Sequence, residues 1–400
     1  MSRIVFAWEL GGGLGHLGPF RPIAERLAAR GHEVTIAACD VERVNAVFGS
    51  RPVTIVQAPL CVKTYGGLAD PPLNYAEILM RYGYLDAPLL GGLLRAWHGL
   101  LELARADLVI ADHAPTALLA ARGRGTPRAL FGNPFVVPPV VSPTPSMRSW
   151  VDVPPERLAS SDASVLDAIN KSLPGDAPRL AALHQIFDGA LRLYMGLPEL
   201  DPYGPRDPDE YLGLYTAVVG SRQVAWPDGT GPRVFVYLHA DYRHIEATLA
   251  ALPASGARCF VYLLGGTPAL WQKYQGPRLA FSAEPVDLGA AVAGCDLYIG
   301  HGSTGGVISV LRAGKPMLLL PSQLEQFLLA SILEKLGVAR LVHPDAQPPD
   351  IAGTLGLALG EPGLARAARE FALRHREPAV DTIAERTAGR IEALARQGTG

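Results

Sequence analysis

The stretch CDLYIGHGSTGGVISVLRAGKPMLLLPSQLEQ, residues 295–326, contains two apolar runs separated by a glycine-rich turn and a helical pattern. The runs, at 296–301 and 316–321, have the length and composition of buried strands. A helix that connects two buried strands is typical of a parallel sheet with helices on both faces. The stretch therefore predicts an α/β protein.

The same alternation continues along the rest of the chain. Further strands are predicted at 4–8, 33–38, 53–58, 107–112, 128–132, 233–238 and 258–264, with helices between them, for example at 19–31 and 325–337. A chain of 400 residues exceeds the size of one hydrophobic core, and each half begins with a buried strand. We expect two doubly wound, Rossmann-like domains with parallel sheets facing across a cleft, and ligands beyond the carboxyl ends of their strands.

The domain boundaries are predicted from a stretch that is rich in proline and acidic residues. Residues 197–213 hold four prolines and several acidic residues and are expected to be a linker. The domains are then 1–215, 216–376 and a C-terminal helix at 377–400 that packs back on the first domain. The Pro-rich stretch 133–150 is either the wall or lid of a pocket or a plain connecting loop.

Composition excludes several classes of protein. A formal net charge of −2 argues against a nucleic-acid partner. The four cysteines form no CxxC pair, which favours reduced thiols in a cytoplasmic protein. The sequence contains no apolar run long enough to span a membrane, so no membrane-spanning helix is expected. The amphipathic segment 89–106 is expected to pack in the core, with peripheral docking on a membrane or partner as the alternative.

The glycine-rich turn after the strand at 296–301 has the chemistry of a diphosphate site. His301, Gly302, Ser303, Thr304, Gly305 and Gly306 precede a helix, and small residues let the backbone approach a ligand closely. The N-terminus of a helix carries a partial positive charge that suits a pyrophosphate. Glu325 and Gln326 follow the next strand and offer a carboxylate and an amide, the groups that sugar hydroxyls need.

This pattern resembles the signature of UDP-glycosyltransferase-like and macrolide-glycosyltransferase-like enzymes, in which HGGxGTxxE is followed by a strand ending in proline and then Asp-Gln or Glu-Gln. The resemblance implies a GT-B fold. It also implies that the turn at 301–306 holds the donor diphosphate, that Glu325 and Gln326 hold the donor sugar, and that further donor contacts come from Gly13, Gly15, His239, Phe281, Glu284 and Val286. Arg243 is a further candidate for a phosphate contact.

Three positions depart from the family pattern. Ala283 replaces the aromatic residue on which the nucleotide base stacks, and Ser309 replaces the glutamate that binds the ribose. Gly306 replaces the usual hydroxyl residue late in the turn.

The resemblance extends to the first domain, where Gly15-His16-Leu17-Gly18-Pro19 matches a GHxxP loop. It implies that His16 deprotonates the acceptor hydroxyl and that Asp112 orients it. Imidazole is mostly neutral at cell pH and can accept that proton, and a carboxylate on its other nitrogen fixes the tautomer. Pro19 suits a first helical position.

Other roles compete for these residues. His16 could cap the following helix, and Asp112 could cap a helix that starts near Pro115. His113 and Glu9 are rival bases. Asp207-Pro208-Asp209 imitates a DxD metal motif but lies in the Pro-rich linker, so we expect no metal there.

The sequence therefore predicts an inverting, metal-independent transferase without a cofactor. It would move a sugar from a UDP- or dTDP-sugar donor to a hydroxyl of a small-molecule or lipid acceptor. A non-catalytic protein that binds a sugar nucleotide or activates a transferase is one alternative, and a sugar-nucleotide epimerase is another.

Overall fold

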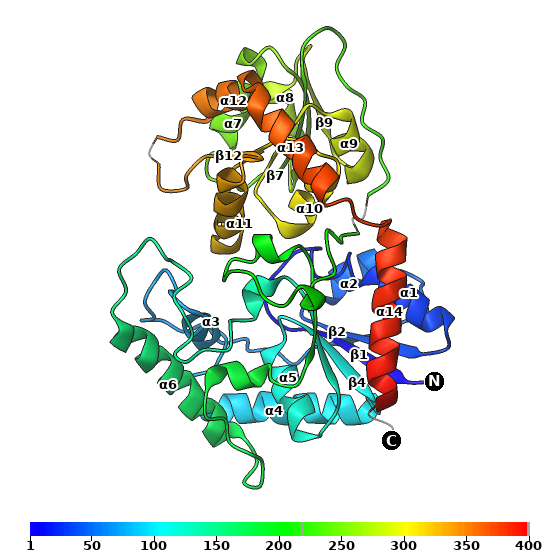
Figure 1. Ribbon diagram of the computed structural model, residues 1–400, viewed down its shortest axis with the longest axis vertical. Helices are drawn as coiled ribbons and strands as arrows, with labels where there is room; N and C mark the ends of the chain where they lie inside the picture. The colour runs from blue at the N-terminus through cyan, green and yellow to red at the C-terminus, as the bar shows by residue number, and fades with distance from the viewer. Residues whose placement is uncertain (218–219, 347, 398–400) are drawn as a thin grey trace. The chain divides into compact units, whose positions relative to one another are not determined.

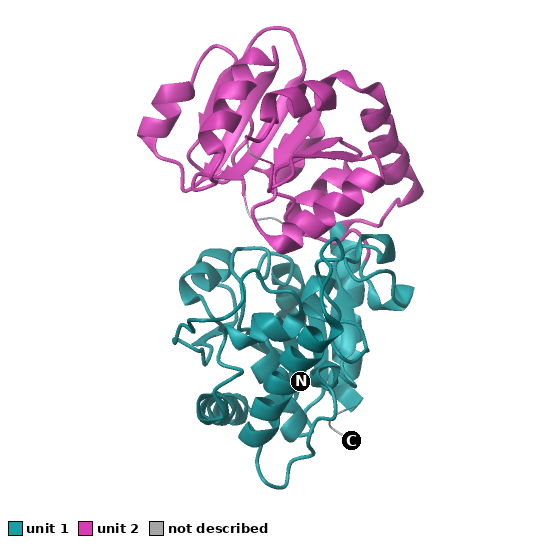
Figure 2. Cartoon of the chain, turned by 90° about the vertical axis from the view of Figure 1, so that its left-hand side faces the viewer, with its two compact units in different colours: residues 1–212, 380–400 teal, residues 213–379 magenta. Residues whose placement is uncertain are grey.

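The computed structural model describes residues 1–217, 220–346 and 348–397, and these form two compact units. Unit 1 comprises residues 1–212 and 380–400, and unit 2 comprises residues 213–379 (Figure 2). Each unit is a parallel sheet with helices on both faces, which confirms the predicted α/β class of two Rossmann-like folds.

Unit 1 contains a six-stranded sheet in the order β3-β2-β1-β4-β5-β6. Its strands are β1 (Arg3–Trp8), β2 (Glu33–Ala38), β3 (Thr54–Gln57), β4 (Leu108–Asp112), β5 (Arg128–Gly132) and β6 (Leu191–Tyr194). β1 pairs with β2 on one side and with β4 on the other, so the chain reverses its direction of travel across the sheet between β1 and β4. Ligands of doubly wound sheets bind at such a switch point.

The helices of unit 1 cover this sheet on both faces. They are α1 (Arg21–Ala29), α2 (Val41–Phe48), α3 (Tyr75–Met80), α4 (Ala87–Leu103), α5 (Pro115–Gly123), α6 (Pro155–Ser172) and α14 (Val380–Gln397). Short 3-10 turns lie at Pro134–Val136, Leu183–Ile186, Pro198–Leu200 and Pro208–Glu210. α4 packs against α5 and α6 and buries Leu90, Leu94 and Trp97, so segment 89–106 belongs to the core of this unit.

Unit 2 repeats the design with a six-stranded sheet in the order β12-β11-β10-β7-β8-β9. Its strands are β7 (Arg233–His239), β8 (Arg258–Leu264), β9 (Leu279–Ser282), β10 (Leu297–Gly300), β11 (Met317–Leu319) and β12 (Ala339–Leu341). Its helices are α7 (Ile245–Ala254), α8 (Pro268–Tyr274), α9 (Leu288–Gly294), α10 (Thr304–Arg312), α11 (Leu324–Lys335), α12 (Ile351–Gly360) and α13 (Pro362–Arg374). The switch point of this sheet lies between β7 and β10.

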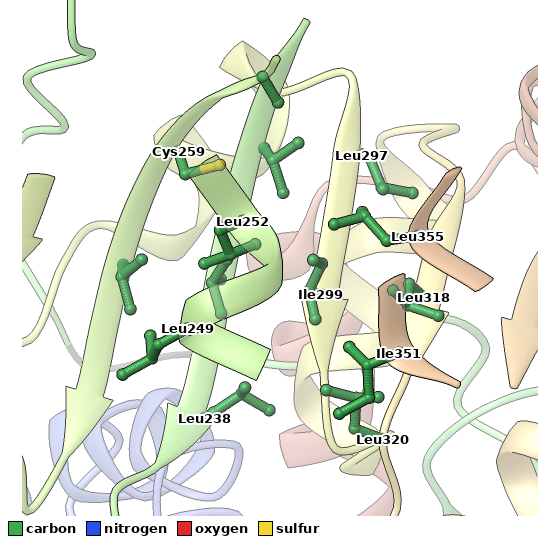
Figure 3. Close-up of a cluster of buried hydrophobic side chains, with 14 of the residues drawn as sticks. Leu238, Leu249, Leu252, Cys259, Leu297, Ile299, Leu318, Leu320, Ile351 and Leu355 are labelled. Carbon is green, nitrogen blue, oxygen red and sulfur yellow. The ribbon is translucent and has the colours of Figure 1, made fainter. Parts of the chain in front are cut away.

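The two faces of the second sheet differ in chemistry. Aliphatic residues such as Leu238, Ile299 and Leu318 pack under α7 and α12 and form a continuous core (Figure 3). Because side chains alternate along a strand, Tyr298 and Gly300 face the opposite side, which α10 covers.

The last helix, α14, belongs to unit 1 and lies along α1 (Figure 1). Its buried face includes Ile383, Ala384 and Ile391. Arg26 lies 2.7 Å from Asp381, and Arg30 pairs with Glu385 across the same contact. α14 begins at Val380, and the preceding helix, α13, ends at Arg374.

The Pro-rich segment 133–150 is anchored to unit 1 by buried polar contacts. Asp162 in α6 accepts hydrogen bonds from the backbone N–H and the hydroxyl of Thr144, at 2.8 and 2.5 Å. Asn74 also donates to Asp162 at 3.3 Å. These bonds fix the middle of the segment to α6 and α3.

Several local expectations fail. α1 begins at Arg21, so Pro22 and not Pro19 lies in its first turn. Strands β6, β9 and β12 are absent from the predicted set; each has only three or four residues. The expectation for the cysteines agrees with the structure, in which all four are free thiols. Within the described ranges, no helix is long and apolar enough to cross a membrane.

Candidate functional site

His16 and Asp112 meet at the switch point of unit 1. Asp112 ends β4 and is the register partner of Trp8, which ends β1. His16 lies in the loop that follows β1, and its Nδ1 is 2.9 Å from Oδ1 of Asp112. Two predicted residues that are 96 positions apart in the printed sequence, 16 and 112, are thus in direct contact.

The surroundings hold this pair in place. The Trp8 ring stacks on the imidazole, with ring centroids 5.0 Å apart. Asp112 is 1% exposed, and its burial raises the pKa of the carboxyl, while the charge and hydrogen bond of His16 act in the opposite direction. A deeply buried carboxylate needs a compensating partner, and His16 supplies it.

Two glycines make room for the pair. Gly132 ends β5 at φ +107, and a Cβ on it would lie 2.9 Å from the Asp112 carboxylate. Gly11 has φ +86, and a Cβ on it would lie 2.9 Å from Nε2 of His16. Only glycine combines this backbone conformation with such close approach.

The contact with Asp112 defines the roles of the two imidazole nitrogens. An ionised carboxylate only accepts hydrogen bonds, so Nδ1 of His16 is the nitrogen that carries the proton. Nε2 is then the basic nitrogen of the neutral ring. In this arrangement Nε2 is chemically able to accept a proton while the carboxylate holds the ring.

Glu9 takes the capping role that was considered for Asp112. It accepts hydrogen bonds from the backbone N–H and the hydroxyl of Thr116 at 2.9 and 2.5 Å, in the first turn of α5. The Tyr84 hydroxyl lies 2.7 Å from the Thr116 hydroxyl. Burial raises the pKa of Glu9 to about 7. Asp112 points to His16 instead, so the alternative that it caps this helix is wrong.

His113, the other rival base, lies between Gly11 and Tyr75 in unit 1. Its φ is 47°, and its carbonyl accepts the N–H of Leu10 at 3.0 Å. Its ring lies 6.0 Å from that of Tyr75. Burial lowers the pKa of His113 to about 3, so the ring stays neutral.

In unit 2, His301 links the ends of three strands. Its Nδ1 lies 2.7 Å from the carbonyl oxygen of Leu320, and its Nε2 accepts the backbone N–H of His239 at 3.0 Å. A carbonyl only accepts, so Nδ1 carries the proton. Burial lowers the pKa of His301 and keeps the ring neutral. His301 therefore fixes the turn at the switch point between β7 and β10.

The glycine-rich turn leads directly into α10. Gly302 has φ +87, and a Cβ on it would lie 3.1 Å from the carbonyl oxygen of Gln326. Ser303 is the N-cap residue, but its side chain makes no capping hydrogen bond. The Thr304 hydroxyl donates to Glu325 at 3.3 Å, and Gln326 accepts the N–H of Ser322 at 2.9 Å. The structure thus gathers Glu325, Gln326 and the turn at one edge of the sheet.

The residues predicted near the nucleotide base are more dispersed. Phe281 packs against the core under α7 and α12. Glu284 is exposed and pairs with Arg222 at 3.1 Å, and Val286 is buried. The Ser309 hydroxyl donates to the carbonyl of Gly305 at 3.0 Å, inside α10.

The remaining candidates have simple structural surroundings. Gly13 and Gly15 lie in the loop after β1, with open space where a Cβ would be. The Arg243 guanidinium donates to the carbonyl of Pro344. Asp207 accepts the N–H of Asp209 at 3.0 Å and caps a 3-10 turn. Among the described residues, no three His, Cys, Asp or Glu side chains gather as metal ligands would.

Sequence reasoning missed Trp8, Gly11 and Gly132, which shape the His16–Asp112 contact. The only signal for Gly132 is a glycine at the end of a buried strand, where a backbone can approach a neighbouring side chain. Trp8 reads simply as the last residue of an apolar run.

Several solved glycosyltransferases have the same fold over nearly the whole chain. VinC in complex with dTDP matches with a TM-score of 0.70 and 18% identity, covering 98% of this chain and 99% of that one. CalG4, the calicheamicin glycosyltransferase, matches with a TM-score of 0.70 and 19% identity, covering 98% of each chain. The spinosyn rhamnosyltransferase SpnG complexed with spinosyn aglycone matches with a TM-score of 0.64 and 18% identity, covering 96% of this chain and 99% of that one.

The chain has the GT-B glycosyltransferase fold. No protein-family model and no curated protein matches its sequence. The GT-B fold places the His16–Asp112 pair in the first Rossmann-like unit and the turn at 301–306 in the second.

Proposed function

We propose that this protein is a glycosyltransferase that moves a sugar from a nucleoside diphosphate donor to a hydroxyl group of an acceptor. The observation that carries the proposal is the 2.9 Å contact between Nδ1 of His16 and Asp112 at the switch point of unit 1. A histidine oriented in this way is a general base for a hydroxyl, whose own pKa is too high for it to ionise at neutral pH.

The donor is a UDP- or dTDP-sugar in this proposal. The turn at 301–306 and the first turn of α10 offer N–H groups and a helix dipole to a diphosphate. Glu325, together with Gln326, supplies polar groups for the sugar hydroxyls. VinC, whose structure holds dTDP, supports a nucleoside diphosphate as the leaving group.

The reaction inverts the anomeric carbon. Nε2 of His16 takes the acceptor proton while the acceptor oxygen forms a bond to the anomeric carbon. The bond from that carbon to the diphosphate oxygen breaks on the opposite face, and its electron pair leaves with the nucleoside diphosphate. Asp112 stabilises the imidazolium, and the N–H groups of α10 stabilise the departing charge. These residues supply each part of the step without a metal or cofactor.

The acceptor is a small molecule or a lipid with a nucleophilic hydroxyl. SpnG, whose structure holds a spinosyn aglycone, supports a small-molecule acceptor. A non-catalytic binder of sugar nucleotides is the second candidate, and it is favoured by Ser309, whose hydroxyl is committed to the helix backbone instead of a ribose.

The test is an incubation of the protein with UDP- and dTDP-sugars, each alone and with a panel of hydroxylated acceptors. Release of free nucleotide and glycosylated product that depends on both substrates supports the proposal. Nucleotide binding without turnover across the panel would favour the non-catalytic candidate, and donor epimerisation without an acceptor would favour an epimerase.

A further inference from the structure

Two buried hydroxyl side chains lie against the first turn of α10. One is Thr216, which is 7% exposed and whose Oγ1 has no protein partner. The other is Tyr298 in β10, which is 1% exposed. Buried hydroxyls are nearly always hydrogen-bonded, so the unpartnered Thr216 hydroxyl has a free donor for a ligand, and the Tyr298 hydroxyl lies beside the same turn.

The backbone of the glycine-rich turn brings Tyr298 to α10. Its ring runs along β10 over Gly300, where a Cβ would collide with the phenolic oxygen. A Cβ on Gly306 would lie 3.0 Å from that oxygen and 3.2 Å from the Ser303 hydroxyl. The two glycines therefore leave the space that the Tyr298 hydroxyl occupies beside the helix.

Thr216 approaches the same turn at the neighbouring residue. A Cβ on Gly305 would lie 3.1 Å from Oγ1 of Thr216. The side chain of Ser303, the N-cap residue, makes no capping hydrogen bond. Three hydroxyls thus lie around the first turn of α10, where the N–H groups of Gly305 and Gly306 point out of the N-terminal end of the helix.

The chemistry of this cluster points to an anion with several oxygens. Burial raises the pKa of Tyr298 far above its ordinary value, so the phenol keeps its proton and can donate. Hydroxyl donors and helical N–H groups that converge near one dipole favour phosphoryl oxygens. No acidic side chain of the described residues hydrogen-bonds to any of the three hydroxyls, so none already occupies their donors.

We propose that Tyr298 and Thr216, with Ser303, donate hydrogen bonds to the diphosphate of the bound nucleotide at the first turn of α10. Tyr298 is then a residue of strand β10 that positions the diphosphate. Its hydroxyl reaches the turn because Gly306 has no side chain in that space. This inference rests on the proposed function, since it concerns the donor of that reaction.

The test is calorimetric titration of the full chain with inorganic pyrophosphate, dTDP, UDP and the matching free nucleosides. The variants are Tyr298→Phe and Thr216→Val, which remove a hydroxyl and keep the shape. Tyr262→Phe is the matched control, because Tyr262 faces the same side of the sheet on β8, two strands from β10. Circular dichroism melts verify that all variants fold.

We expect each of the two variants to weaken binding of pyrophosphate, dTDP and UDP about ten-fold, as loss of a hydrogen bond to a charged group does. Nucleoside affinity and the Tyr262→Phe control should stay at wild-type values. Equal diphosphate affinity in wild type and both variants would overturn the inference, and so would a wild-type protein that binds none of the three diphosphates. Loss of diphosphate affinity in a protein that transfers no sugar would support the inference and overturn the proposed function.

Discussion

The carboxylate of Asp112 lies against the backbone of Gly132, close enough that a Cβ at that glycine would come within 2.9 Å of it. Asp112 also contacts His16 at 2.9 Å. The geometry of the proposed base therefore depends on β5, the strand that ends in Gly132 and contains neither His16 nor Asp112. Both contacts occur at the carboxyl ends of neighbouring parallel strands, the first between β4 and β5 and the second at the switch point between β1 and β4.

Substitution of Gly132 by alanine should therefore damage both stability and activity. Gly132 has φ +107, which strains any other residue, and the added methyl group pushes Asp112 away from His16. We expect a loss of about 1–3 kcal/mol in the free energy of unfolding from backbone strain alone, and a larger loss of turnover. The control is Gly125→Ala, at φ +67 with open space around it, which should cost stability but not turnover. Urea unfolding and initial rates measure the two effects, and equal rates in both variants would contradict the steric argument.

Asp112→Asn should lower kcat by about 10²–10⁴-fold with little change in donor KM. An amide cannot stabilise the imidazolium, and its N–H₂ group can reverse the tautomer of His16. Asp188→Asn is a suitable control, because Asp188 pairs with His184 at 3.4 Å elsewhere in unit 1. If steady-state rates of Asp112→Asn match those of the control, the orienting role is wrong.

Glu9 should make the stability of the protein depend on pH. The pKa of Glu9 is about 7 in the folded chain and near 4.5 in the unfolded chain, so the folded state binds the extra proton between these values. Stability should then fall as the pH rises from 4.5 to 7, by about 1.4 kcal/mol per pH unit relative to Glu9→Gln. Urea unfolding of both proteins at pH 5, 6, 7 and 8 measures this difference. A constant difference across the series would show that Glu9 does not titrate there.

His301→Ala should destabilise unit 2, because two backbone groups lose their hydrogen-bond partner. The partly buried backbone N–H of His239 and the buried carbonyl of Leu320 would lose their hydrogen bonds. Each such group costs about 1–3 kcal/mol in the free energy of unfolding. His343→Ala, at an exposed position, is the control and should change stability little. Comparable stabilities of the two variants would mean that His301 does not fix the turn.

Much of the fold follows from the sequence because buried parallel strands are continuous apolar runs. All nine predicted strands exist, and each half of the chain forms its own sheet. β9, with the sequence LAFS, and β12, with ARL, escaped prediction since runs of four and three residues carry no periodic signal. β6, LRLY, joins the edge of its sheet with only its last two residues buried.

The candidate site was only partly predictable. The contact between His16 and Asp112 was expected from a family resemblance, because spacing along the chain says nothing about which strands become neighbours. Both ring nitrogens of His301 are hydrogen-bonded to backbone groups, the N–H of His239 in β7 and the carbonyl of Leu320 after β11. No sequence motif specifies these partners. Tyr298 reads as one more apolar residue of a strand, and only the glycines around its hydroxyl reveal another role.

The central claim is that His16 is the base of a sugar transfer, and the most direct measurement compares wild type, His16→Ala and His184→Ala. The assay follows nucleotide release and product formation from UDP- and dTDP-sugars with the best acceptor of the panel, alongside calorimetric affinity for dTDP and UDP. We expect His16→Ala to lose at least about 100-fold in kcat with unchanged nucleotide affinity, while His184→Ala, which loses a different His–Asp pair of unit 1, retains full activity. Sugar transfer by His16→Ala at the wild-type rate would contradict the account.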